Sequence, residues 1–405
     1  MAGPVNTAFS SRKKAFAFAN QVDAETPTVL SSADCIDVSS VSYTPSSQTT
    51  QDPRYSGTVH RPGDILLGAL YDVTFEWIIH GHGAGTIPAA NAFLPGRILQ
   101  AWGFTENRFA TAIAAEAFSD GDNTNITLGT TAVGTAGLYK GLAVNVDDIA
   151  AAPAGLAMVT DYTSGKVATL ARSRAVNSAT GDYSIPAQLA YTLSATEPAN
   201  PASITVWEGD AGGSGHRINF AGMRPTAARI ELVTASLEGG GDGYCKITGT
   251  FRGAKLSEAD EAAPVVSNAI ATPPFRDGQQ DIANVQLGGS SVTIDLGIRS
   301  GYPPNPNQGA GNDPGIVVET RRTVAYTLNK VRRSVIDFNA LADAQAQHAS
   351  QFLWGLASGN YVGVMIDTQR FDYPSTNESG DFIQTQGSAW IDEADKALAI
   401  TFPIY

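Results

Sequence analysis

The residues of this chain that could do chemistry are few and widely spaced. His80 and His82 flank one glycine, so in an extended segment their imidazoles project to the same side, a spacing that suits a metal ion. A metal site needs a third ligand, and none of His60, His216 and His348 adjoins this pair in the sequence. We therefore expect His80 and His82 to be a pair at a loop edge, and no metal centre.

Two glycine-rich stretches, 212–215 and 238–243, share only their composition with phosphate-binding loops. A P-loop lies between a strand and a helix and continues into Lys-Ser/Thr, which neither stretch does. Asp392 and Glu393 are adjacent carboxylates in an expected turn, and the sequence has no GxSxG nucleophile elbow. We expect hairpin tips and solvated surface at these places, no cofactor and no enzymatic activity.

Charge and cysteine content exclude further classes. The formal net charge is −13, which argues against a general DNA-gripping surface. Cys35 and Cys245 stand alone in strand-like runs, so we expect small buried hydrophobes and not a disulfide or a metal site. Residues 1–20 lack the apolar segment of a secretory signal, and no run of about 18 apolar residues predicts a transmembrane helix.

One basic cluster stands out against this acidic background. It consists of Arg321, Arg322, Lys330, Arg332 and Arg333. A site for nucleic acid would need interleaved aromatic residues and a wider basic field, and only a single tyrosine is close. The cluster is predicted to contact an acidic surface of a neighbouring copy, with an ordinary solvated face as the alternative.

The elements that would carry these residues are mostly strands. In 72–79 the apolar residues alternate with polar ones, which predicts a strand with one face in a core, and 323–328 shows the same alternation. Two helices are expected. The first runs from Leu94 to Trp102, and the second has an apolar stripe from Ala342 to Leu356 with a stop at Gly359.

The same order of elements occurs twice along the chain. Each copy is expected to have a short strand, a long Gly/Pro loop, a second strand, one helix and a run of closing strands. The first copy includes the segments 36–43, 45–68, 69–80, 203–209, 217–221 and strands up to 251. The second copy includes 285–296, 297–315, 316–330, 361–368, 370–374 and strands up to 402. Such duplicated units are typical building blocks of stacked architectures.

The sequence predicts a mainly β (α+β) protein whose two repeated domains each have two packed sheets flanked by one helix. The first copy carries an insertion with short strands at 141–146, 156–162 and 166–171 and a hairpin turn at 163–165. The expected division is an N-terminal arm at 1–30, a first domain at 31–114 plus 203–255, a small β module at 115–202, a linker at 256–281, and a second domain at 282–405.

At this level of organisation the chain resembles the tail tube proteins of long, non-contractile-tailed bacteriophages, in the version with two fused tube domains. The resemblance in the first copy lies in Ala33 to Val38, Tyr55 to Gly57, Asp72 to Trp77 and Leu99 to Phe104. In the second copy it lies in Pro273 to Phe275, Val292 to Leu296, the expected helix and Leu398 to Pro403.

The resemblance implies a structural virion protein whose domains join around a lumen in rings that stack into a tube. Each long loop would reach the adjacent ring. Two fused domains would let three chains form a pseudo-sixfold ring, with six chains per ring as the alternative. Other implied partners are the tape measure, terminator and distal tail proteins, and double-stranded DNA passing through without specific binding. The protein would be made in the host cytoplasm, bind no membrane and end in the phage tail.

Two other functions stay open at this stage. A β-rich phage adhesin or decoration protein could use the insertion to bind a surface glycan, although the aromatic residues of that segment are widely spaced. A secreted β-sandwich enzyme is disfavoured because the signal and an acid/base pair are missing. If the insertion points outward, a three-chain ring would carry three outer protrusions and a six-chain ring six.

Overall fold

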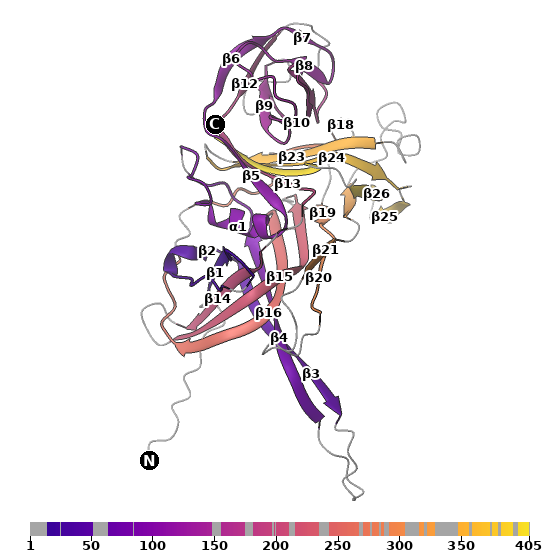
Figure 1. Ribbon diagram of the computed structural model, residues 1–405. Coiled ribbons are helices and arrows are strands. Elements are labelled where there is room, and N and C mark those ends of the chain that lie inside the picture. The colour runs from indigo at the N-terminus through magenta and orange to yellow at the C-terminus, as the bar shows by residue number, and fades with distance from the viewer. Residues whose placement is uncertain are drawn as a thin grey trace, which may run out of the picture.

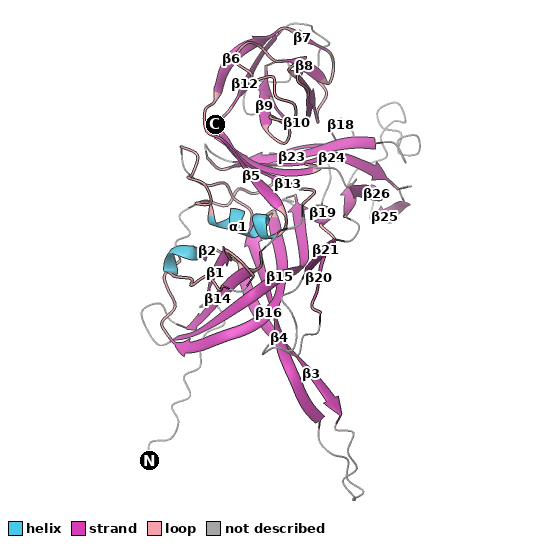
Figure 2. Cartoon of the chain, in the orientation of Figure 1, coloured by secondary structure: helices cyan, strands magenta, loops and turns pink. Residues whose placement is uncertain are grey.

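The computed structural model is mainly β, as the sequence predicts, and the described residues contain one α-helix. Its layered sheets are drawn in Figures 1 and 2, with α1 (Leu94–Ala101) and the short 3₁₀ helix η1 (Ser32–Asp34) near the first strands. The structure describes residues 14–24, 26–51, 64–83, 85–147, 155–174, 181–196, 198, 200–209, 215–234, 243–266, 270–275, 278–282, 285–286, 291–303, 316–319, 322–328, 347–355, 359–372, 375–379, 382–391 and 396–404.

The strands fall into three groups. The first half of the chain contributes β1 (Lys14–Asn20), β2 (Cys35–Ile36), β3 (Ser40–Gln51), β4 (Asp64–Ile78), β5 (Phe104–Phe109), β13 (Gln188–Leu193), β14 (Ala202–Gly209), β15 (Gly215–Val233) and β16 (Lys246–Asp260). The second half contributes β17 (Gln279–Ile282), β18 (Val285–Gln286), β19 (Ser291–Asp295), β20 (Ile298–Gly301), β21 (Ile316–Glu319), β22 (Thr323–Leu328), β23 (Gln347–Gly355), β24 (Tyr361–Phe371), β25 (Ser375–Ser379), β26 (Phe382–Ile391) and β27 (Leu398–Pro403). The module between β5 and β13 contains β6 (Ile113–Phe118), β7 (Asp120–Gly121), β8 (Asn125–Thr127), β9 (Ala143–Val146), β10 (Leu156–Tyr162), β11 (Val167–Leu170) and β12 (Gly181–Ile185).

Strands from both halves form one antiparallel sheet, which we call the eight-strand sheet. Its order is β3, β4, β16, β15, β19, β22, β26, β25, so the first four strands come from the first half and the last four from the second. The halves join where β15 pairs with β19, from Arg229 opposite Asp295 to Val233 opposite Ser291.

The two sets of four strands are built on the same plan. One rung across the first set consists of residues that lie directly opposite one another, namely Ser40, Glu76, Thr248 and Arg229. The matching rung across the second set consists of Ser291, Thr327, Gln386 and Ser375. These rungs align Ser-Val-Ser at the start of β3 with Ser-Val-Thr at the start of β19. The chain therefore contains an internal structural repeat of a four-strand unit.

A second layer repeats as well. In the first half β2, β1, β14 and β15 pair in that order, and in the second half β18, β17, β23 and β24 do the same. On the other side of β24 the layer continues through β27, β13 and β5. The last strand of the chain thus pairs with a strand of the first half, and the two halves are joined in both layers.

The second predicted helix is wrong where the structure describes it, because 347–355 forms β23. Phe352 and Trp354 face the main core, while Leu353 packs against Met158 and Met365 under the module. A strand buried on both faces reads as an apolar run, and spacing alone does not separate it from a helix. Ala342 and Ala346 lie outside the described residues, and Gly359 has the positive φ of 75° that suits a chain reversal.

The matching of 203–209 with 361–368 is also wrong. The counterpart of β14 is β23, and the segment 361–368 belongs to β24, which corresponds to the first part of β15. Because the sequence predicts a helix where β23 lies, the predicted matching of the two copies is displaced by one strand.

The predicted loop 45–68 is a hairpin at 45–51 and 64–68, and its remaining residues, 52–63, lie outside the described part of the chain. β3 and β4 pair as far as Gln51 opposite Asp64, and together they extend away from the body of the molecule (Figure 1). Pro45 does not prevent this pairing because among the described strands β3 pairs only with β4, so its outer edge needs no donor. In the second copy β20 lies inside the predicted loop 297–315 and pairs with β21, which begins just after that loop at Ile316. Residues 304–315 lie outside the described residues.

Strands also occupy parts of the predicted arm and linker. β1 lies within 1–30 and is almost wholly buried between β14 and β2. β16 continues to Asp260, opposite His216, so the chain is still paired inside 256–281, and β17 begins before that range ends. Acidic composition did not prevent pairing because 255–260 is exposed, where charged side chains are solvated.

One main core fills the space between the layers and extends through both halves. The ring of Phe16 stacks on Phe75 with centroids 4.9 Å apart, and Trp102 stacks parallel to Phe75 at 6.3 Å. The predicted alternation in 72–79 is confirmed, since Val73, Phe75, Trp77 and Ile79 are buried. The first helix is confirmed too, with Pro95 in its first turn and Gly103 just beyond it at a φ of 91°.

The module has its own core, built around Tyr139, Tyr162 and Tyr183. Its strands β9, β10 and β11 confirm the three predicted strands of the insertion, and the hairpin turn 163–165 connects the last two. β13, which the sequence assigns to the insertion, lies in the main layer instead.

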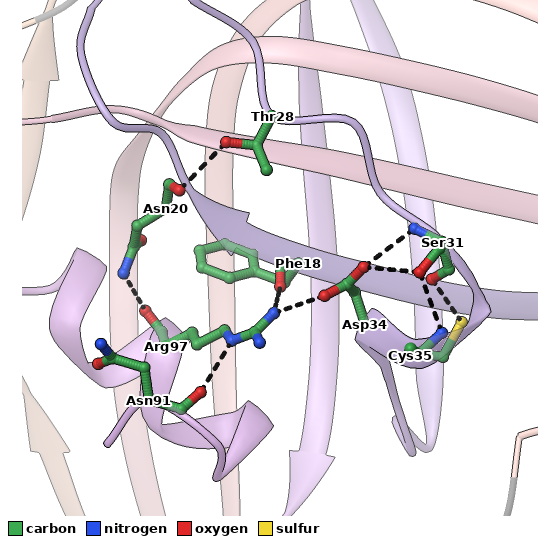
Figure 3. Close-up of polar contacts among 9 residues, drawn as sticks. Phe18, Asn20, Thr28, Ser31, Asp34, Cys35, Asn91 and Arg97 are labelled. Atoms are coloured by element: carbon green, nitrogen blue, oxygen red, sulfur yellow. Dashed lines mark hydrogen bonds and ion pairs between the residues drawn. The ribbon is translucent and has the colours of Figure 1, made fainter. Parts of the chain in front are cut away.

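Arg97 ties the first elements to the helix (Figure 3). Its guanidinium donates to the backbone oxygens of Phe18 and Asn91 and lies 2.8 Å from Asp34 Oδ1. Burial favours a raised pKa for Asp34, but hydrogen bonds from Arg97 and Ser31 outweigh it and lower the pKa below its ordinary value. β1, α1 and η1 are thereby held as one unit.

Candidate assembly surfaces

The candidate metal pair is a buried packing site and not an exposed loop edge. His80 Nε2 lies 3.0 Å from Asp37 Oδ2, and His80 Nδ1 lies 2.7 Å from the carbonyl oxygen of Gly81. Burial opposes a charged imidazole, but the hydrogen bond and charge of Asp37 outweigh it and raise the pKa of His80. Trp77 Nε1–H also donates to His80 Nε2 over 3.3 Å, so three neighbours hold this imidazole in place.

The His82 side chain makes different contacts from that of His80. Its ring packs edge-on against Phe93 with centroids 6.5 Å apart, and burial lowers the pKa of His82. In the described part of the chain, no three His, Cys, Asp or Glu side chains gather as a metal site would require. The two imidazoles therefore serve different packing contacts.

The remaining candidate residues are scattered. His216 lies near Glu258 and Asp260 at one end of β15 and β16, and His348 lies in β23. Arg322 is buried and its carbonyl oxygen accepts from the N–H of Ile391. The other candidates, His60, Arg321, Lys330, Arg332, Arg333, Asp392, Glu393, 212–214 and 238–242, lie outside the described residues.

Both cysteines are free. Cys245 is fully buried, as expected of a small hydrophobe, and burial raises its pKa to about 12. Cys35 is partly buried and its pKa is raised to about 11, mainly by burial. Neither thiol has the lowered pKa of a reactive cysteine. None of the helices that the structure describes is long and apolar enough to cross a membrane.

The eight-strand sheet has an organised polar face on the side opposite the core. Ser, Thr and paired charged residues alternate along it with the core positions. In the first half this polar face consists of Ser40, Ser42, Thr44, Asp72, Thr74, Glu76, Arg229, Glu231, Lys246, Thr248, Thr250 and Arg252. In the second half β19 and β22 continue it with Ser291, Thr293, Asp295, Thr323 and Ala325.

Each cation of the first-half polar face is neutralised by a carboxylate. Arg252 makes two hydrogen bonds of 2.7 Å to Asp72, a bidentate pair of fixed geometry. Lys246 Nζ lies 3.0 Å from Glu76 and 3.6 Å from Glu231.

Arg229 completes this set, because its Nε lies 3.1 Å from Glu231 Oε1. Burial alone would raise the pKa of Glu76, but hydrogen bonds from Ser39 and Lys246 lower it, so the pair stays charged at neutral pH. The polar face thus offers no unpaired cation among its described first-half residues to hold a polyanion.

The eight-strand sheet has two open edges, β3 and β25. Among the described residues β3 pairs only with β4, and β25 only with β26. An open edge presents backbone donors and acceptors and invites pairing with another strand. Lys14 reaches the first edge, since its Nζ lies 3.4 Å from the carbonyl oxygen of Val41 and 2.8 Å from Glu208. A charged lysine beside an open edge disfavours unspecific pairing of that edge with other strands.

The module packs firmly on the second half. Lys140 Nζ lies 2.6 Å from Asp367 Oδ2, and the Met158 N–H donates to Gln351 Oε1 over 2.8 Å. Burial raises the pKa of Asp367 even with Lys140 beside it. The module therefore covers the outer surface of β23 and β24 as part of the body.

The sequence did not reveal this polar face, because a Ser or Thr on a strand is equally common on any solvated sheet. The signal in the sequence is that the charged residues on the polar positions of 72–76 are acidic, whereas those on the polar positions of 246–252 are basic. Pairing those charges required knowing that β4 and β16 are neighbours.

No model of a known protein family matches the chain, and none of the curated proteins is detectably similar to it in sequence.

Proposed function

We propose that this protein is the repeating subunit of a bacteriophage tail tube, whose stacked rings form the conduit for genome ejection. The observation that carries the proposal is the β15–β19 junction, where two equivalent four-strand units stand side by side with open edges outermost. A chain that already joins two units laterally can add more units at both ends in the same way. Such head-to-tail contacts close into a ring when their rotation permits.

The polar face suits the wall of a DNA conduit. DNA carries about one negative charge per 1.7 Å of duplex axis, so unpaired lysines or arginines on a lumen wall would retain it. Here Lys246, Arg229 and Arg252 are paired with carboxylates, and the remaining positions are mainly Ser and Thr. With the polar face toward the lumen, the duplex would meet hydroxyls and neutral pairs.

The β3–β4 hairpin supplies a means of stacking. It projects beyond the body of the molecule in Figure 1, whereas β20 and β21 lie against β15, with Ser300 bonded to the carbonyl oxygen of Pro225. A long projecting hairpin gains its stabilising contacts from a partner. The adjacent ring is the partner we propose, with three chains per ring because each chain holds two units.

Electron microscopy of the purified protein tests the proposal. Hollow rings or tubes at high protein concentration are the expected result, with sixfold pseudosymmetry and three modules on the outside of each ring. A particle that stays monomeric by mass photometry and imaging across salt, pH and concentration would contradict the proposed function.

A further inference from the structure

The β15–β19 junction serves as a template for the contact between chains. It joins the last strand of one four-strand unit to the first strand of the next. The equivalent free strands are β25, at the end of the second unit, and β3, at the start of the first. Building on the proposed function, we infer that β25 of one chain pairs antiparallel with β3 of a second copy, in the register that the β15–β19 junction sets.

The equivalence of the two units fixes this register residue by residue. Thr248 lies opposite Arg229 in the first unit, and its counterpart Gln386 lies opposite Ser375, so Ser375 takes the place of Arg229. Asp295 has Thr44 as its counterpart, because each closes the same rung of its unit. Since Arg229 lies opposite Asp295, Ser375 of one chain lies opposite Thr44 of the next.

The rest of the contact follows from antiparallel pairing. The inferred opposite pairs are Ser375 with Thr44, Asn377 with Ser42, and Ser379 with Ser40. β25 has 5 residues, Ser375–Ser379, and they match the 5 residues of β19 that β15 engages. The segment of β3 that they meet, Ser40 to Thr44, has three exposed residues at alternate positions.

In the single chain, a lysine side chain contacts this segment of β3. Lys14 Nζ lies 3.4 Å from the carbonyl oxygen of Val41, in the middle of the inferred contact. Val292, the counterpart of Val41, lies opposite Leu232 of β15 instead. Pairing with a second copy would therefore replace the lysine contact with a backbone ladder, which explains how the edge is protected before assembly and used during it.

Cysteine pairs test the register directly. Ser42→Cys with Asn377→Cys places two thiols directly opposite each other, where Cα atoms lie about 4.5–5.5 Å apart and a disulfide can form. The matched positive control is Thr293→Cys with Glu231→Cys, the equivalent pair inside one chain. The off-register control is Ser42→Cys with Ser375→Cys, a diagonal pair about 7–8 Å apart. All variants carry Cys35→Ser, because Cys35 is partly exposed.

After mild oxidation of assembled protein, the Ser42/Asn377 variant should run as covalently linked chains on a non-reducing gel. The Thr293/Glu231 control should show a disulfide within one chain, and the off-register variant should remain unlinked. Well-formed tubes without linked chains, or stronger linking of the off-register pair, would overturn the inferred register and leave the proposed function standing. Linked chains in open filaments, with no rings, would support the register and contradict the tube.

Discussion

Arg229 lies directly opposite Asp295, although one belongs to the first half of the chain and the other to the second. This pairing turns two sheets of four strands into one. Just behind it Ile230 lies opposite Ile294, and both side chains are fully buried. The junction is thus a sheet interior, continuous with the main core, and not a contact between separate bodies.

Ile294→Ala should therefore destabilise the whole chain. Removing a buried isoleucine side chain at 0% exposure costs about 2–5 kcal/mol, through lost burial and the cavity left behind. Denaturant unfolding followed by tryptophan fluorescence measures the change. Thr293→Ala, on the polar side of the same strand, is the matched control and should change the free energy of unfolding by no more than about 0.5 kcal/mol. Equal effects of the two variants would mean that the junction is not part of the core.

A second prediction concerns Gly81, where the first half meets the turn before β24. A Cβ at this position would lie 2.3 Å from the carbonyl oxygen of Gly359 and 2.7 Å from the Cα of Asn360. Gly81→Ala should therefore push the halves apart and cost about 1–3 kcal/mol, as overpacking does.

Thermal unfolding of Gly81→Ala beside Gly85→Ala gives the comparison, since a Cβ at Gly85 meets nothing within 4 Å. Hydrogen exchange should rise at the N–H of Gly81, which donates to Asn360 Oδ1 over 2.9 Å. An unchanged melting temperature for Gly81→Ala would contradict the close approach.

The sequence predicts where the strands lie much better than it predicts which strands pair with one another. Alternation at Val73, Phe75 and Trp77 predicts one buried face because that face meets a single core. Alternation does not predict β23, because both of its faces are buried: Phe352 faces the main core and Leu353 faces the module. Its second buried face exists only because a segment distant in sequence covers it.

The candidate functional residues show the same difference between local patterns, which the sequence predicts, and long-range contacts, which it does not. Local spacing singles out His80 and His82, yet their partners, Asp37 and Phe93, come from other elements and make the pair a packing site. The ion pairs of the polar face are equally long-range, as between Lys246 and Glu76. A repeat of elements is visible in the sequence, whereas the β15–β19 junction that gives the repeat its meaning depends on the fold.

The third prediction is an acid-dependent loss of stability that depends on Arg97. Arg97 and Ser31 keep the folded-state pKa of Asp34 below its ordinary value of 3.8. Their stabilising effect is therefore fully present above pH 3.8 and is lost as the pH falls through the folded-state pKa. Arg97→Met should lower the melting temperature at neutral pH and reduce the further loss on acidification.

Melting curves between neutral and acidic pH test this dependence. Arg108→Met is the control, because Arg108 Nε donates to the backbone oxygen of Pro88 over 2.9 Å. The two variants should differ most near neutral pH and converge in acid. Parallel pH profiles for Arg97→Met and the unsubstituted protein would show that Asp34 does not depend on this arginine.

The last prediction addresses the neutral polar face. The Oγ1 atoms of Thr74 and Thr250 lie 2.9 Å apart on the polar face, and both side chains are uncharged. Thr250→Lys adds one unpaired cation per chain, repeated around every ring of a tube. Short duplex DNA should then bind assembled protein, with an affinity that falls steeply as salt rises, because bound phosphates release counterions.

Ser164→Lys adds the same charge at an exposed position of the module and is the matched control. Co-sedimentation of tubes with labelled duplex should show retention for Thr250→Lys, and none for the unsubstituted protein or Ser164→Lys. Retention by Ser164→Lys alone would place the module, and not the polar face, toward the lumen. Equal retention by all three would mean that the paired charges do not keep the wall neutral to DNA.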